Sequence, residues 1–244
     1  MFDAIRNPQG ELLDVAFAEG EGGGDQLVVI GHGVTANKDR DWAITLAKAL
    51  NAAGFASLRF SFSGNGDSEG DFRASCPTKE VSDLGAVLDA IAASERDWVV
   101  AYAGHSMGAV VGVQRAFIDG RIEMLISLGG MVDTHAFAQR KFGDVVPGEG
   151  FMWEKPECPL SQEFLDDMET IGSVERLANQ VQVPWLLVHG DADTVVPVEE
   201  SDRMASLGAD TELIVLEGAD HVFSDDAAQL MADAVVDWLS DAGE

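Results

Sequence analysis

Apolar and polar residues follow two recurring patterns along the chain. Continuous apolar runs of strand length occupy residues 27–30, 56–60, 98–103, 122–128, 185–188 and 213–216. Between them lie segments whose apolar residues are spaced for one face of a helix, such as Val81, Leu84 and Leu88. Continuous apolar strands indicate a sheet covered on both faces, and their alternation with helices indicates parallel crossover units. We therefore predict an α/β fold with a mostly parallel central sheet flanked by helices. Residues 11–18 alternate in part and predict an antiparallel edge strand.

A long segment between residues 131 and 176 departs from these patterns. It shows no strand signal, and prolines at 147, 156 and 159 interrupt any long helix. An insertion of this length is typical of a lid over a site. We expect residues 1–130 and 177–244 to form the α/β core and residues 131–176 to form a lid or cap. Its large apolar residues either cover a hydrophobic substrate or pack the lid onto the body.

Composition limits the class of protein and its partners. The 244 residues are 46% hydrophobic, which is enough for the core of one large domain. No apolar run reaches 18 residues and the first residues lack a signal-peptide pattern, so a soluble, cytoplasmic protein is expected. The 43 acidic and 15 basic residues give a net charge of −28, which argues against nucleic acid and anionic membranes as partners. A saline habitat and an ordinary acidic cytosolic enzyme both explain this charge.

Histidine and cysteine spacings give no sign of a metal site. The five histidines contain no HExxH motif, and Cys76 and Cys158 lie far apart without CxxC spacing. Free thiols are the preferred interpretation, with a disulfide left open. We expect no metal and no cofactor.

The pentapeptide Gly104-His105-Ser106-Met107-Gly108 carries the strongest chemical signal. It matches the G-x-S-x-G nucleophile elbow, and it lies between an apolar strand-like run and a helix-like run, as that motif requires. The two glycines allow the tight turn that exposes the serine hydroxyl at the edge of the sheet. Ser106 is therefore the candidate nucleophile.

A serine nucleophile needs a base, and the base needs an orienting carboxylate. His221 follows the strand-like run 213–216, and Asp193 follows the run 185–188, so both are expected at the same sheet edge as Ser106. Asp191 is the rival carboxylate, but its place next to the strand end favours a role in the turn. The order Ser106, Asp193, His221 is the order of α/β-hydrolase triads.

An oxyanion formed during acyl transfer needs backbone donors. The Met107 amide, directly after the nucleophile, is one candidate. The Val34 amide, in the loop after residues 27–30, is the second, and Gly33 before it allows close approach. We interpret His32 and His105 as structural residues.

These motifs make the chain resemble the α/β-hydrolase superfamily over nearly its full length. The segments GHGVTANKD, from Gly31, and RFSFSGNGDSEG, from Arg59, are similar to the branch that contains cinnamoyl and feruloyl esterases. Monoacylglycerol lipases and proline-type serine aminopeptidases share much of this pattern. The resemblance implies ester hydrolysis through an acyl-enzyme, without cofactors, under a compact lid. Ser61 and Ser63 depart from it, since they replace the Asp and Arg of the family's D-x-R-G-x-G-x-S segment.

We therefore predict a serine hydrolase, and more specifically an esterase, that cleaves small to medium carboxylic esters. A serine aminopeptidase or amidase acting on short substrates is the alternative, and a non-catalytic binding module with this fold is a third hypothesis. Residues 144–169 hold eight acidic residues against one basic residue, Lys155, so we expect the lid to repel anionic leaving groups such as coenzyme A. This favours a neutral-ester hydrolase over a thioesterase acting on acyl-CoA. Chain length and motifs leave the oligomeric state open.

Overall fold

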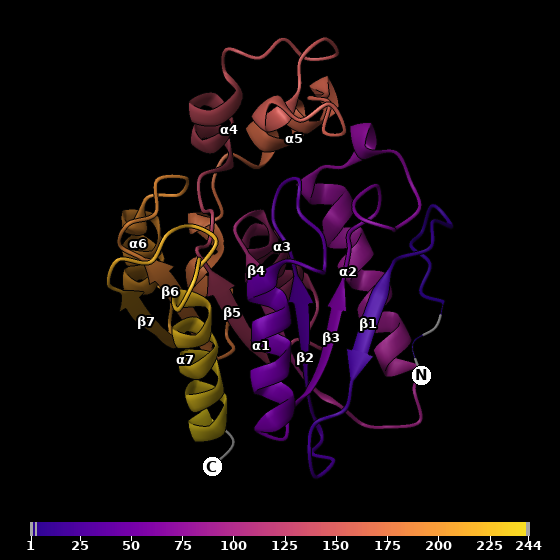
Figure 1. The fold of residues 1–244 in the computed structure, drawn as a ribbon, viewed down its shortest axis with the longest axis vertical. Helices are drawn as coiled ribbons and strands as arrows, with labels where there is room; N and C mark the ends of the chain where they lie inside the picture. Colours follow the sequence, from indigo (N-terminus) through magenta and orange to yellow (C-terminus); the bar gives the residue numbers. More distant parts are fainter. Residues whose placement is uncertain (1, 3, 243–244) are drawn as a thin grey trace.

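The computed structural model describes residue 2 and residues 4–242 (Figure 1). Within these residues one seven-stranded sheet has the order β1-β3-β2-β4-β5-β6-β7. Its strands are β1 Val15–Ala18, β2 Gln26–Gly31, β3 Ala56–Phe60, β4 Val99–His105, β5 Met124–Leu128, β6 Trp185–Gly190 and β7 Thr211–Leu216. All neighbours pair in parallel except β1, which pairs antiparallel with β3. The predicted mostly parallel sheet and antiparallel edge strand are thereby confirmed.

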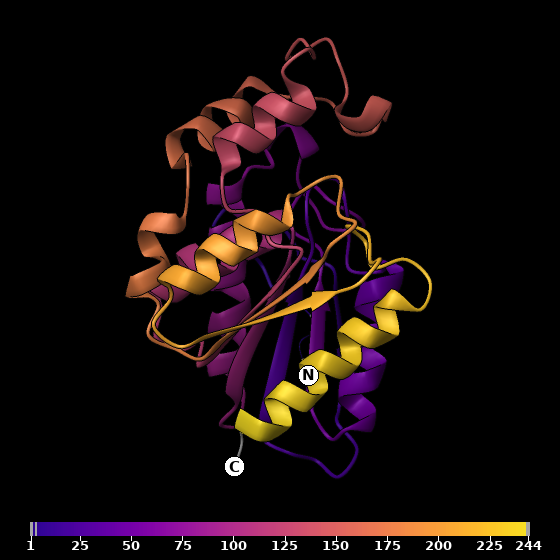
Figure 2. The ribbon, with the colours of Figure 1, turned by 90° about the vertical axis from the view of Figure 1, so that its left-hand side faces the viewer.

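Helices cover both faces of the sheet. The α-helices are α1 Asp41–Ala52, α2 Pro77–Ala92, α3 Met107–Ile118, α4 Thr134–Phe142, α5 Gln162–Ile171, α6 Val198–Leu207 and α7 Ala227–Ala242. Short 3-10 turns are η1 Phe72–Ala74, η2 Met152–Glu154 and η3 Glu175–Gln180. Figure 2 shows α1 and α7 on one side of the sheet, with α2, α3 and α6 on the other.

The continuous apolar strands have a direct structural reason. Leu27 and Val29 on β2 pack into the core on the α2 and α3 side, whereas Val28 and Ile30 pack into the core beneath α1 and α7. Successive side chains of a strand point to opposite faces, so a strand covered on both sides requires apolar residues throughout. The sheet can therefore hold loop residues at its carboxyl edge on a rigid support.

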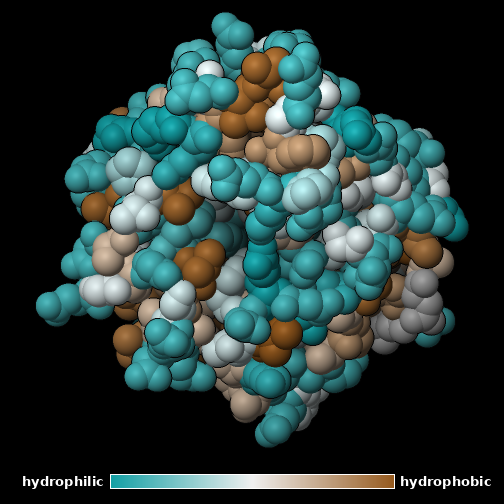
Figure 3. Space-filling view, turned by 45° about the horizontal axis from the view of Figure 1, so that its top comes forward, coloured by the Kyte–Doolittle hydropathy of each residue, from teal (hydrophilic) through white to brown (hydrophobic). Residues whose placement is uncertain are grey.

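Residues 131–176, which we call the cap, lie beyond the carboxyl ends of the strands (Figures 1 and 2). The cap contains α4, η2 and α5, and buried aromatic rings join its parts: Phe142 stacks edge-to-face on Phe164, with 6.1 Å between ring centroids. Viewed with the cap side forward, the surface is mostly hydrophilic and its hydrophobic residues form small separate patches (Figure 3). In the described part of the chain, every helix is too short or too polar to cross a bilayer.

Candidate active site

Ser106 lies in a strained turn between β4 and α3. Its φ of 54° and ψ of −116° place a non-glycine residue in the left-handed region, a conformation that costs on the order of 1–3 kcal/mol and is concentrated at functional sites. The Ser106 amide donates to the Leu128 carbonyl at 2.9 Å, which fixes the turn to β5. A Cβ on Gly104 would clash with the Gly108 carbonyl, so the strand and helix can meet only with glycine at this position.

The structure brings Ser106, His221 and Asp193 together. The His221 Nε2 lies 3.1 Å from the Ser106 Oγ, and the His221 Nδ1 lies 2.7 Å from the Asp193 Oδ2. A carboxylate only accepts, so the proton of neutral His221 is on Nδ1. The Nε2 is then free to accept the serine proton. Ser106 is 3% exposed, so the hydroxyl lies inside the protein at the base of a pocket.

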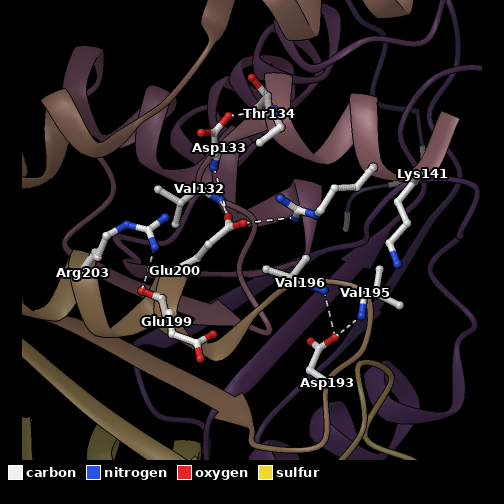
Figure 4. A network of polar contacts seen from close by, with 12 residues as sticks. Val132, Asp133, Thr134, Lys141, Asp193, Val195, Val196, Glu199, Glu200 and Arg203 are labelled. Atoms are coloured by element: carbon white, nitrogen blue, oxygen red, sulfur yellow. Dashed lines mark hydrogen bonds and ion pairs between the residues drawn. The ribbon is translucent and has the colours of Figure 1, made fainter. Parts of the chain in front are cut away.

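The loop after β6 holds Asp193 in its ionised form. The Asp193 side chain is fully buried, and its Oδ1 accepts from the amides of Val195 at 2.7 Å and Val196 at 2.9 Å (Figure 4). Burial alone raises the pKa of Asp193, but hydrogen bonds from His189 and His221 outweigh it and hold this pKa well below its usual range. Asp191 instead accepts from the Gly218 amide at 2.6 Å, in the turn beside the strand end.

His189 is a member of this network that sequence reasoning missed. Its Nε2 lies 3.2 Å from the Asp193 Oδ2 and 3.1 Å from the Val196 carbonyl, and its Nδ1 lies 2.7 Å from the Ser201 hydroxyl. The carbonyl requires a proton on Nε2 of the neutral ring, so Nδ1 accepts from Ser201. His189 therefore contacts the same carboxylate oxygen, Oδ2, as His221 does. The sequence carried one signal of this contact: His189 lies near the end of β6, four residues before Asp193.

Two other histidines hold the loops around Ser106. His105 lies 2.7 Å through its Nε2 from the His221 carbonyl and packs between Trp42 and His221. Burial lowers the pKa of His105 to about 3, so the ring is neutral.

His32 accepts from the Phe62 amide at 3.0 Å, and its Nδ1 lies 2.9 Å from the Gly33 carbonyl. Burial lowers the pKa of His32 to about 4. Both imidazoles contact backbone groups of the surrounding loops, and neither lies in the hydrogen bond between His221 and Ser106.

The two candidate oxyanion donors flank Ser106. A Cβ on Gly33 would lie 2.8 Å from the Ser106 Cβ, so the loop that carries Val34 passes directly against the nucleophile. Met107 is the first residue of α3. Neither the Val34 nor the Met107 amide donates a hydrogen bond to an acceptor among the described residues. Two free N–H groups next to a serine hydroxyl can bind a developing oxyanion.

A pocket of about 300 Å³ opens above Ser106 between the core and the cap. This volume lies at the small end of ligand sites, which span roughly 300–1,000 Å³. The core contributes Val34 and Trp42 to its wall, and the cap contributes Phe137 and Trp153. The charged residues of its lining are two cations, Arg40 and Lys155, and no Asp or Glu lines it within the described chain.

The cap is attached to the loop that carries Asp193. Glu200, a buried residue of α6, accepts from the Val132 amide at 2.8 Å and the Asp133 amide at 3.1 Å (Figure 4). Lys141 of α4 donates to the Thr194 carbonyl at 2.8 Å, next to Asp193. These bonds position the cap's first helix relative to the candidate site.

Histidine, cysteine and acidic residues of the described chain form no group of three that could hold a metal ion. Cys76 and Cys158 are buried free thiols, so the preferred interpretation of the cysteines is confirmed.

The sheet order, the turn at Ser106 and the overhanging cap together define an α/β-hydrolase. A family model described as serine aminopeptidase, S33, matches residues 24–148, and the chain belongs to this family of serine hydrolases. Two matching uncharacterised proteins of Mycobacterium tuberculosis are 27% identical over 221 residues. The match covers 84% of this chain but only 66% of those relatives, so the chain spans less than two thirds of their length.

Solved structures share the fold over nearly the whole chain. Est1E from Butyrivibrio proteoclasticus, solved with ferulic acid bound, is 24% identical with a TM-score of 0.85, and 98% of each chain is covered. Mouse alpha/beta hydrolase domain-containing protein 10 is 18% identical with a TM-score of 0.80 and 99% of each chain covered. A monoacylglycerol lipase of Paleococcus ferrophilus is 21% identical with a TM-score of 0.69, covering 93% of this chain and 98% of the lipase.

Proposed function

We propose that the protein hydrolyses small carboxylic esters through an acyl-enzyme on Ser106. The observation that carries this proposal is the continuous hydrogen-bonded chain from Ser106 through His221 to Asp193, at 3.1 Å and 2.7 Å, beneath a partly apolar pocket. The fold shared with Est1E and with a monoacylglycerol lipase also supports ester chemistry.

The reaction follows from the positions of the groups. The Ser106 Oγ attacks the ester carbonyl carbon while the His221 Nε2 takes the hydroxyl proton, and the buried Asp193 stabilises the resulting imidazolium. The oxyanion accepts hydrogen bonds from the Val34 and Met107 amides. Collapse of the tetrahedral intermediate expels the alcohol, which receives the proton from His221. Water then attacks the acyl-enzyme with His221 as its base, and the acid leaves.

An aminopeptidase is the alternative that the family's description favours. Such an enzyme binds the substrate's terminal ammonium group, which calls for a carboxylate in the pocket. Within the described residues the pocket lining offers two cations and no Asp or Glu. This lining favours an ester over a peptide with a free amino terminus, so alanine 4-nitroanilide should be turned over far more slowly than 4-nitrophenyl butyrate.

Replacing the nucleophile tests the proposal. Ser106→Ala should lower kcat for 4-nitrophenyl butyrate by about 10⁴-fold or more, because no other group can form the acyl-enzyme. Ser206→Ala is the matched control, since Ser206 is an exposed residue of α6 that does not line the pocket. Circular dichroism should show both variants folded. Turnover by Ser106→Ala at the wild-type rate would refute the proposed function.

A further inference from the structure

The charge of the pocket is opposite to the charge of the molecule. The chain carries 43 acidic and 15 basic residues, yet Arg40 and Lys155 are the charged residues that line the pocket within the described chain. A random selection of charged residues from this chain would be mostly acidic. The two cations in the lining are therefore a local feature of the pocket, and we ask what the pocket could bind through them.

Most cations of this protein already have an acidic partner. Ten of the fifteen Lys and Arg residues lie within 4.0 Å of an Asp or Glu carboxylate among the described residues. The five without such a partner are Arg40, Lys48, Lys141, Lys155 and Arg176. Two of these five line the pocket above Ser106. A cation with no carboxylate within 4.0 Å among the described residues is available for an anion from outside.

Arg40 extends from the core to the pocket with most of its donors unused. It is the residue before α1, and its one side-chain hydrogen bond within the described chain runs from Nη2 to the Thr35 carbonyl at 3.3 Å. A guanidinium group carries five N–H donors in a planar arrangement that suits a carboxylate. Arg40 is close enough to the buried His32 and His105 to lower their pKa further, after the larger effect of burial. Arg40 is itself an exposed residue, and it lines the pocket from the core side.

Lys155 brings the second positive charge from the cap. It follows η2 and is half-buried, and its ammonium group makes no hydrogen bond or ion pair with another described residue. The eight acidic residues between positions 144 and 169 do not line the pocket, whereas their single basic neighbour does. Repulsion of anionic leaving groups by the cap stays a prediction, but within the described residues the pocket lining itself carries no acidic residue that would cause it. The sequence gives the number of charged residues in the cap but not the direction in which their side chains point.

We propose that the substrate is an ester that carries a carboxylate, which Arg40 and Lys155 bind from the core and from the cap. This inference rests on the proposed ester hydrolysis and adds the substrate class. The small pocket and its apolar wall, which includes Val34 and Phe137, fit a short hydrocarbon chain between the ester and the carboxylate. The carboxylate belongs either to the acid part or to the alcohol part of the ester, and the experiment below separates the two.

The net charge of −28 does not prevent this binding. Solvent ions screen exposed charges beyond about 8–10 Å at physiological ionic strength, so the distant acidic surface acts weakly on an ion inside the pocket. Lys155, which is half-buried in the pocket lining, is screened less than such exposed charges. Local charge therefore dominates once the substrate has entered.

Two matched pairs of esters test the inference. Monomethyl adipate and methyl hexanoate differ by a carboxylate in the acid part, and 4-acetoxybutanoate and butyl acetate differ by one in the alcohol part. For one of the pairs, Arg40→Gln and Lys155→Gln should each lower kcat/KM of the anionic ester about fivefold, and the double variant about twentyfold. The neutral ester should change by less than about twofold. The affected pair identifies the part of the substrate that carries the carboxylate.

The control variant is Lys48→Gln, which removes an exposed cation of α1 that has no ion pair among the described residues and lies outside the pocket. It should leave the ratio of anionic to neutral turnover unchanged in both pairs. If the Arg40→Gln, Lys155→Gln double variant also keeps the wild-type ratio in both pairs, the inference is wrong while ester hydrolysis stands.

Binding separates this inference from the proposed function. In the Ser106→Ala background, calorimetry should show that one anionic ester binds more tightly than its neutral match, and that the double variant removes this advantage. If the wild type hydrolyses none of the four esters, the proposed function fails, and the binding result alone decides the inference. Equal binding of anionic and neutral esters in both pairs would overturn it.

Discussion

Two buried carboxylates of this protein are in opposite electrostatic situations. Asp193, in the loop after β6, has a fully buried side chain, and Glu80, in the first turn of α2, is 1% exposed. Asp193 is surrounded by the imidazoles of His221 and His189 and by two backbone amides. Its pKa is held well below the usual range although burial alone would raise it.

Glu80 has far fewer donors. Its Oε1 accepts from the Ser75 hydroxyl at 3.2 Å, and its Oε2 has no hydrogen-bond partner among the described residues. Burial, and then the nearby Asp83, raise the pKa of Glu80 well above its usual value. The difference teaches that burial does not decide the charge of a carboxyl group; the donors placed around it do. In this protein the donors surround Asp193, the carboxylate that contacts His221.

The largest expected effect comes from removing the negative charge at Asp193. Asp193→Asn should lower kcat for the preferred ester by about 10³–10⁴-fold, because an amide cannot hold His221 in the required tautomer or stabilise its charged form. The matched control is Asp191→Asn, since Asp191 is an exposed turn residue. We expect this control to retain at least about a third of the activity. Similar activity in the two variants would contradict the assignment of Asp193, and not Asp191, as the carboxylate that orients His221.

The smaller effect concerns Glu80 and appears in stability. The folded protein retains a proton on Glu80 that the unfolded chain releases near the ordinary pKa of 4.5. The free energy of unfolding therefore falls as the pH rises from 4.5 toward the raised pKa. Glu80→Gln cannot ionise, so in urea unfolding its stability relative to the wild type should rise from pH 5 to pH 8, by at least about 1 kcal/mol.

The control for this measurement is Glu95→Gln, which changes an exposed carboxylate after α2. It should follow the pH dependence of the wild type. A difference between wild type and Glu80→Gln that stays constant from pH 5 to pH 8 would contradict a raised pKa for Glu80.

The sheet was largely predictable, because its strands are buried on both faces and must be continuously apolar. The prediction ended the fourth strand at residue 103, but β4 extends to His105. Gly104 and His105 still pair with Ser127 and Leu128 of β5, a contact between segments far apart in the sequence. Periodicity cannot show such pairing, so the strand end was placed too early.

The candidate triad was predictable for a related reason. Parallel strands place their carboxyl ends at one edge, so residues that follow different strands can be assigned to one site from the sequence alone. The pocket lining was not predictable in this way. The cap that carries Lys155 has no regular pattern, and Arg40 precedes a helix without any motif. Side-chain direction in such segments depends on tertiary packing, which local spacing does not encode.

The most direct test of Ser106 as an activated nucleophile is its covalent labelling. A fluorophosphonate should add once to the wild-type protein, as seen in the intact mass, and peptide mapping should place it on Ser106. The Ser106→Ala variant should remain unlabelled, and Asp193→Asn should be labelled much more slowly because its His221 is poorly oriented. An unlabelled wild type, or a label that persists in Ser106→Ala, would contradict the assignment of Ser106 as an activated nucleophile.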